Sequence, residues 1–133
     1  MKIENIKFKA KRLDNGKWVV GYFYAECGNT YIIENRQKES KLNRNPAYQV
    51  DPATVCQFTG LKDCEGNEVW EGDILQDVDF GHDKYVVIFG GGTFLAQRED
   101  RYAGIPLNKC IDNFGNLTCT KVVGNKFVRR SSV

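Results

Sequence analysis

The sequence of 133 residues contains a single histidine, His82, and no apolar run long enough to cross a membrane. Catalytic triads need a histidine or an equivalent base, so any such site would have to use His82. This histidine lies in the sequence Phe80-Gly81-His82-Asp83, which is typical of a surface turn. We therefore predict no catalytic residues and no enzymatic activity.

Five cysteines are present, an odd number, and no two of them have the C-x-x-C spacing of a zinc or redox motif. They are Cys27, Cys56, Cys64, Cys110 and Cys119. The first ten residues carry charges where a signal peptide would have an apolar segment, so we expect a cytoplasmic protein with reduced, mostly buried thiols. A zinc site built from cysteines of distant strands is the less favoured alternative. We predict no metal and no cofactor.

The formal net charge of +2 is nearly neutral and does not by itself predict nucleic-acid binding. The charges are segregated, however. Residues 63–83 contain no lysine or arginine, whereas both ends of the chain are rich in them. Such a pattern either steers one surface onto a partner or reflects ordinary solvated faces.

Alternating aspartates mark the end of the acidic region. Asp73, Asp77 and Asp79 share one side of a strand expected at residues 73–80, and the other side holds Ile74, Val78 and Phe80. Three carboxylates on one face can hold magnesium for phosphoryl chemistry. They are also typical of a solvated outer face, which we favour. Asp73 follows a glycine, so its carboxylate can accept backbone N–H groups of the turn.

Apolar and basic residues alternate in the N-terminal segment, which predicts a half-buried strand. We expect Ile6, Phe8 and Ala10 to point inward and Lys7, Lys9 and Lys11 to line the outer face. The lysines form either a phosphate-binding stripe or a charged face that discourages aggregation, and we favour the second interpretation. Asp14-Asn15-Gly16 predicts a hairpin turn before an aromatic strand at residues 18–24.

Short strands separated by glycine turns continue through the rest of the chain. We expect strands at residues 30–33, 54–59, 68–70, 73–80, 85–89, 93–96 and 121–124, and one short helical turn within residues 105–113. Residues 35–49 are polar and lack an apolar face, which predicts a flexible connection. The pattern indicates a mainly β protein that forms a small antiparallel barrel or roll.

One long segment has a family signature. The sequence VDPATVCQFTGLKDCEGNEVWEGDIL at residues 50–75 resembles the signature of the YopX family of phage and prophage proteins. The opening KFKAKR, the hairpin VVIFGGGTF and the late VVGN are similar to other parts of that family. Cys56 and Cys64 depart from the family pattern, which weakens any family-wide metal site at these cysteines.

The resemblance implies one YopX-like domain over residues 1–133 in the bacterial host cytoplasm. Within it we expect an N-terminal β-hairpin region at 1–34, the flexible loop at 35–49 and an SH3-type barrel at 50–133. It carries over no catalytic, cofactor-binding or metal-binding residue.

We therefore expect a non-enzymatic binding or assembly module for a protein partner or for itself, with no membrane association. The alternative is a nucleic-acid-associated protein, or less favourably a metal-dependent nuclease, that uses the basic termini and the aromatic residues. Trp18, Tyr22, Tyr24 and Trp70 could form its stacking platform or simply the core.

Overall fold

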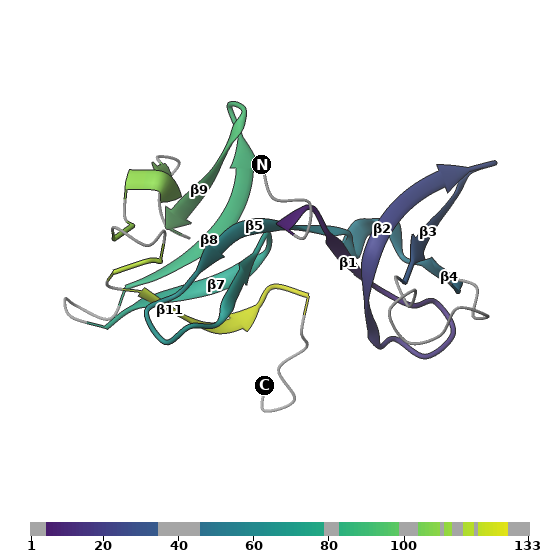
Figure 1. Ribbon diagram of the computed structural model, residues 1–133, viewed down its shortest axis with the longest axis horizontal. Helices are drawn as coiled ribbons and strands as arrows, with labels where there is room; N and C mark the ends of the chain where they lie inside the picture. Colours follow the sequence, from purple (N-terminus) through teal and green to yellow (C-terminus); the bar gives the residue numbers. More distant parts are fainter. Residues whose placement is uncertain are drawn as a thin grey trace. The chain divides into compact units, whose positions relative to one another are not determined.

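The computed structural model describes residues 5–34, 46–78, 83–98, 104–109, 111–112, 116–118 and 120–127. The chain forms two compact units, unit 1 at Met1–Gln57 and unit 2 at Phe58–Val133. The described residues form antiparallel strands and short 3₁₀ turns, so the predicted mainly β fold is confirmed (Figure 1). No helix in the described ranges has the length and hydrophobicity needed to span a lipid bilayer.

Unit 1 is one antiparallel sheet. Its strands are β1 (Phe8–Lys11), β2 (Trp18–Glu26), β3 (Asn29–Ile33), β4 (Ala47–Val50) and the start of β5 (Cys56–Lys62). Neighbouring strands pair in the order β4-β3-β2-β1-β5, and β5 contributes Cys56 and Gln57 to this sheet. A 3₁₀ turn, η2 (Pro52–Thr54), connects β4 to β5.

One face of this sheet is apolar because every second residue of its strands is a hydrophobic residue. Ala10, Val19, Ile32 and Val50 form a buried cluster against which Phe8, Tyr48 and Val55 pack. The inward orientation predicted for Ala10 and Phe8 is thus confirmed. Ile6 lies before the strand and is exposed, so its predicted inward position is wrong.

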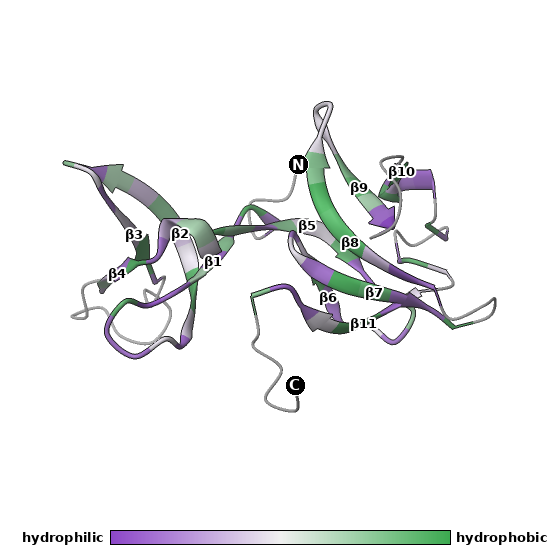
Figure 2. Cartoon of the chain, turned by 180° about the vertical axis from the view of Figure 1, so that it is seen from behind, coloured by the Kyte–Doolittle hydropathy of each residue, from purple (hydrophilic) through white to green (hydrophobic). Residues whose placement is uncertain are grey.

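Unit 2 is built from the end of β5 and six more strands. These are β6 (Glu68–Trp70), β7 (Asp73–Asp77), β8 (Lys84–Gly90), β9 (Thr93–Arg98), β10 (Gly104–Pro106) and β11 (Thr120–Asn125), with a 3₁₀ turn, η3, at Leu107–Lys109. β5 and β6 form a hairpin, and the other strands pair in the order β10-β9-β8-β7-β11. The apolar middles of β7 and β8 stand out in Figure 2. Val69, Leu75, Val87, Leu107 and Leu117 form the core of the unit.

The described strand pairings leave both sheets open, so the SH3-type barrel expected at residues 50–133 is not confirmed. The division between the units falls after Gln57, within β5. The scheme of regions at 1–34, 35–49 and 50–133 stays a prediction, and residues 35–45 of its loop lie outside the described residues.

The predicted flexible connection at residues 35–49 is wrong for its last three residues. Ala47, Tyr48 and Gln49 belong to strand β4, which pairs with β3. In this strand Ala47 and Gln49 are exposed, Tyr48 is half-buried and Val50 is buried. This alternation is too short to stand out beside the polar residues that precede it.

A second correction concerns the faces of β7. The aspartates were expected outside and Ile74 and Val78 inside. Leu75, which lies between Asp73 and Asp77 on the same side, is buried in the core of unit 2, and Asp73 is only 3% exposed. Ile74 is buried as well, whereas Val78 is exposed. The first three residues of β7 are buried on both sides of the strand. The alternation of acidic and apolar residues therefore does not show which side faces the core.

Candidate functional site

The acidic residues singled out in the sequence serve the fold. The Asp73 carboxylate accepts hydrogen bonds from the backbone N–H of Trp70 at 2.8 Å and from Nδ2 of Asn125 at 3.0 Å. The predicted role of Asp73 in its turn is thus confirmed. Because both oxygens already have donors, Asp73 is poorly placed to bind magnesium together with Asp77. Asp79, like His82, lies outside the described residues.

Asp63 is a buried carboxylate with several hydrogen-bond donors. It is 1% exposed and accepts backbone N–H groups of Glu65 at 2.9 Å, Asn67 at 2.8 Å and Val122 at 2.8 Å. The tight turn that follows it has Gly66 at a φ of 87°, a backbone conformation that favours glycine. Asp63 therefore joins the β5–β6 hairpin to strand β11.

Burial alone would raise the pKa of Asp63, but the hydrogen bonds from Val122, Asn67 and Glu65 outweigh it and lower this pKa below its ordinary value. A group with a lowered pKa in the folded protein stabilises the fold above the pKa that it has when unfolded. This stabilisation is lost as the pH falls through the folded pKa.

We predict from this shift that unit 2 loses stability on acidification below about pH 4, the usual range of an aspartate. Urea unfolding at a series of pH values between neutral and acidic measures the effect. Asp63→Asn is expected to flatten this dependence in addition to lowering stability at pH 7. An unchanged slope in the variant would contradict the role of Asp63.

The three cysteines within the described residues share no common site. Cys56 is buried, and its thiol donates to the backbone oxygen of Thr54 at 3.2 Å. Cys27 and Cys64 are exposed, so the prediction of mostly buried thiols is wrong for these two. Slight desolvation of the exposed Cys64 thiol, together with the negative charges of Asp63 and Glu65, raises its pKa. Cys110 and Cys119 lie outside the described residues, and the described part of the chain contains no cluster of metal ligands.

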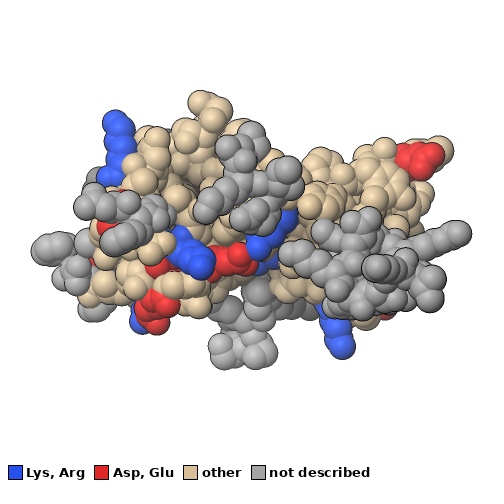
Figure 3. Space-filling view, viewed as in Figure 1, with Lys and Arg blue, Asp and Glu red and all other residues tan. Residues whose placement is uncertain are grey.

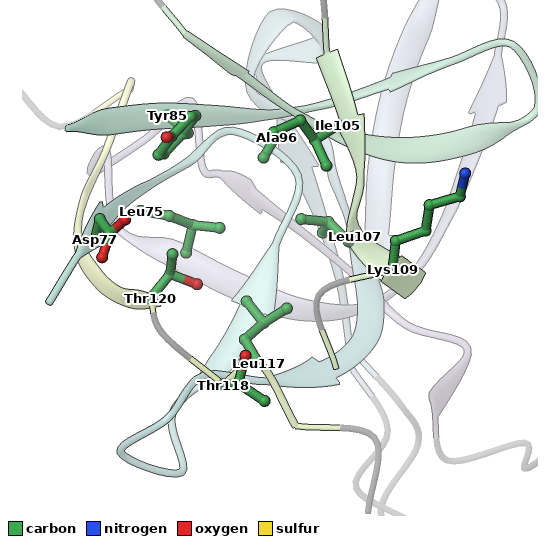
Figure 4. A pocket seen from close by; sticks show the side chains of 10 residues that line it. All are labelled: Leu75, Asp77, Tyr85, Ala96, Ile105, Leu107, Lys109, Leu117, Thr118 and Thr120. Atoms are coloured by element: carbon green, nitrogen blue, oxygen red, sulfur yellow. The ribbon is translucent and has the colours of Figure 1, made fainter. Parts of the chain in front are cut away.

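A pocket of about 340 Å³ lies in unit 2 and is mainly apolar. In Figure 4 the side chains of Asp77, Tyr85 and Thr120 lie at one end, and Lys109 lies at the other. Three of the lining residues, Leu75, Leu107 and Leu117, belong to the core of the unit. The pocket is thus an opening in the hydrophobic core, and its polar groups do not converge on one point.

The outer face of unit 1 has a different composition. Residues directly opposite each other on paired strands share a face, as do residues two apart along a strand. The pairs Lys9–Val20, Lys11–Trp18, Tyr22–Ile33 and Tyr24–Tyr31 therefore lie together on the side opposite to the core cluster of unit 1. We call these eight residues the basic-aromatic face.

Side chains on this face contact one another. The ammonium groups of Lys9 and Lys11 lie 4.8 and 5.5 Å from the ring centroid of Trp18, within the range of cation–π contacts. The rings of Tyr24 and Tyr31 stack at 4.9 Å with an interplanar angle of 17°. Val20 and Tyr22 are 42% and 40% exposed. The face thus combines accessible aromatic area with positive charge.

The sequence predicts most of this face. The outward orientation of Lys9 and Lys11 is confirmed, and Trp18, Tyr22 and Tyr24 lie on one side of β2, as their spacing requires. Trp70 is the exception, since it is buried in unit 2 against Phe58, with 5.2 Å between the ring centroids. Tyr31 was missed, although the turn at Gly28 fixes the register that places it opposite Tyr24.

Comparison with known protein families gives one result. A model described as YopX protein matches residues 7–127. The chain belongs to the YopX family. No curated protein was found that matches this YopX chain.

The YopX signature at residues 50–75 consists largely of structural residues. Asp51 caps the 3₁₀ turn η2 by accepting the backbone N–H of Ala53 at 3.0 Å, and the hydroxyl of Thr54 accepts the backbone N–H of Lys11 at 2.9 Å. Asp63 and Asp73 anchor unit 2, as described above. The signature of this YopX protein therefore specifies its scaffold, and the basic-aromatic face lies outside it.

Proposed function

We propose that this YopX protein is a non-enzymatic binding module that contacts its partner through the basic-aromatic face of unit 1. The observation that carries the proposal is an open sheet face on which aromatic rings and lysines lie together. Aromatic residues are enriched at protein interfaces and at nucleic-acid-binding surfaces, because they bring large contact area at a small cost in conformational entropy. The buried aspartates of unit 2, by contrast, are used by the fold.

The partner is a protein, a second copy of the chain, or a nucleic acid. For a second copy or another protein, the edge of the unit 1 sheet offers a further contact. In the described pairings, β1 pairs with β2 only as far as Gly21. Residues 22–26 of β2 pair with β3 on one side, and no pairing is described on their other side. Such an edge can accept another strand. The phage or prophage origin and the bacterial cytoplasm implied by the resemblance are part of this proposal.

A photo-crosslinking amino acid at position 22 tests the proposal. We expect adducts at this position, with the purified protein alone for self-association and in cell extract for another partner. The same amino acid in place of Phe89, an exposed aromatic of unit 2, is the matched control and is expected to give few adducts. Adducts at position 22 are expected to decrease when Lys9 and Lys11 are replaced with glutamine.

Equal adducts at positions 22 and 89, or none at position 22 under either condition, would overturn the proposal. Digestion of the adducts then identifies the class of partner. Adducts that a nuclease removes contain nucleic acid. Adducts that only a protease removes contain protein, and those with twice the mass of the chain from purified protein alone contain a second copy.

A further inference from the structure

Single-stranded nucleic acid matches the chemistry of the basic-aromatic face. We propose that this face binds a single strand, with bases on its aromatic rings and phosphates near its lysines. The inference rests on the proposed function and specifies the partner. A protein partner in place of nucleic acid is one outcome of the tests below.

Charge is the first argument. Unit 1 contains ten lysines and arginines against six aspartates and glutamates, a net charge of +4, whereas unit 2 contains nine against eleven, a net charge of −2. The basic C-terminal end nevertheless belongs to unit 2, and residues 35–45, outside the described residues, supply +3 of the +4 of unit 1, so the net charge of the units does not locate a binding surface. On the face seen in Figure 3, charges of both signs are scattered over the described residues. Attraction for phosphate therefore has to come from a local group of lysines rather than from a field of the whole molecule.

Lys9 and Lys11 are such a group. They lie two residues apart on β1 and on the same side of the sheet, both within cation–π distance of Trp18. Lysine is depleted in the cores of protein interfaces, because burial removes the hydration of its ammonium group. On a surface that follows a nucleic-acid backbone, the same lysines replace condensed counterions. Their position beside Trp18, which is half-buried, and on the same face as the exposed Tyr22 thus favours nucleic acid over protein.

The aromatic residues are the second argument. Trp18, Tyr22 and Tyr24 lie at alternate positions of β2, and Tyr31 extends the row onto β3. Bases stack on such rings only when they are not already stacked and paired within a duplex, so this chemistry selects single strands. Glu26 lies on the same side of β2 at its far end, and its negative charge repels phosphate there. The strand is therefore expected to bind at the end of the face near Trp18 and Tyr22.

Fluorescence anisotropy with a labelled oligothymidine of about 12 nucleotides, within the site size of small β folds, tests the inference. We expect binding at low salt that weakens as salt is added, and weaker binding of a duplex of the same length. For single strands, each phosphate neutralised adds about 0.7 to the slope of log affinity against log salt concentration. Replacing both Lys9 and Lys11 with glutamine is expected to reduce this slope by about 1.4. Lys84→Gln, on β8 of unit 2, removes one positive charge away from the face and is the control, expected to leave the slope unchanged.

Substitutions of Tyr22 distinguish stacking from general hydrophobic contact. Tyr22→Leu keeps apolar area but removes the ring, and it is expected to weaken oligonucleotide binding by about fivefold or more. Tyr22→Phe is expected to retain binding, and Phe89→Leu in unit 2 is the control. Tyr22 is exposed, so these changes are expected to leave the fold intact, which circular dichroism checks.

The absence of binding at low salt, or binding that is equal in Tyr22→Leu and wild type, would overturn the inference. Equal affinity for single strand and duplex would do so as well. None of these results would overturn the binding module itself, because protein adducts specific to position 22 would still support it. The loss of those adducts together with oligonucleotide binding would contradict both proposals.

Discussion

Alanine in place of Gly21 is expected to disrupt the sheet of unit 1. Gly21 lies in the middle of β2, and a Cβ atom at this position would lie 1.9 Å from the backbone oxygen of Ile33 and 2.7 Å from its carbonyl carbon. These atoms belong to the backbone, so they cannot move aside as a flexible side chain would. The end of β3 would have to separate from β2, where Tyr22 pairs with Ile33.

The expected loss of stability is about 3 kcal/mol or more, at the upper end of the range for overpacking. Thermal unfolding followed by circular dichroism measures it, and hydrogen exchange identifies the amides that lose protection, expected on β2 and β3. Gly90→Ala is the matched control. Gly90 ends strand β8, and an added Cβ would meet only the Leu95 side chain at 3.7 Å, an ordinary contact. Equal unfolding temperatures for Gly21→Ala and this control would contradict the close contact between Gly21 and the backbone of Ile33.

Replacing Asp63 with alanine is expected to have a comparable effect on unit 2. The substitution removes the acceptor of three backbone N–H groups and of the Asn67 side chain, which donates at 3.3 Å. These donors are part-buried, and each one left without a partner costs at most about 1–3 kcal/mol, although such costs are not additive. We expect a loss of about 3 kcal/mol or more, a large part of the 5–15 kcal/mol by which a folded domain is usually stable.

Glu65 is the control in the same turn. Its carboxylate is exposed and lies 3.7 Å from Nζ of Lys121, so Glu65→Ala is expected to cost less than about 1 kcal/mol. Urea unfolding of the two variants at pH 7 compares them directly. Equal losses in both variants would show that the turn as a whole, rather than the buried carboxylate, stabilises this region.

The sequence predicts the local features of this fold because they depend on neighbouring residues. The turns at Gly16, Gly66 and Gly91–Gly92 and the strands that they connect follow from residue type and alternation. The outward side of β1 and β2 follows in the same way, which is why most of the basic-aromatic face could be predicted.

Features that depend on distant residues could not be predicted. Asp63 and Asp73 are acidic residues in turns and look solvated, but donors from β11 allow their burial. The prediction for β7 is wrong because an aspartate in a strand usually marks the solvent side, whereas Asp73 is buried. For Trp70 the sequence leaves the stacking platform and the core open, since residue type alone does not reveal burial, and the structure places it in the core.

The hydrogen bonds to β11 have a consequence for folding during synthesis. Val122 is 59 residues beyond Asp63, and Asn125 is 52 residues beyond Asp73. At 5–20 residues per second, the ribosome needs roughly 3–12 s to add the residues between Asp63 and Val122. All strands of unit 1, in contrast, have been made once Gln57 has left the ribosome. We expect unit 1 to fold while translation continues. Asp63 in the β5–β6 hairpin and Asp73 at the start of β7, in contrast, stay in water until the final strand emerges.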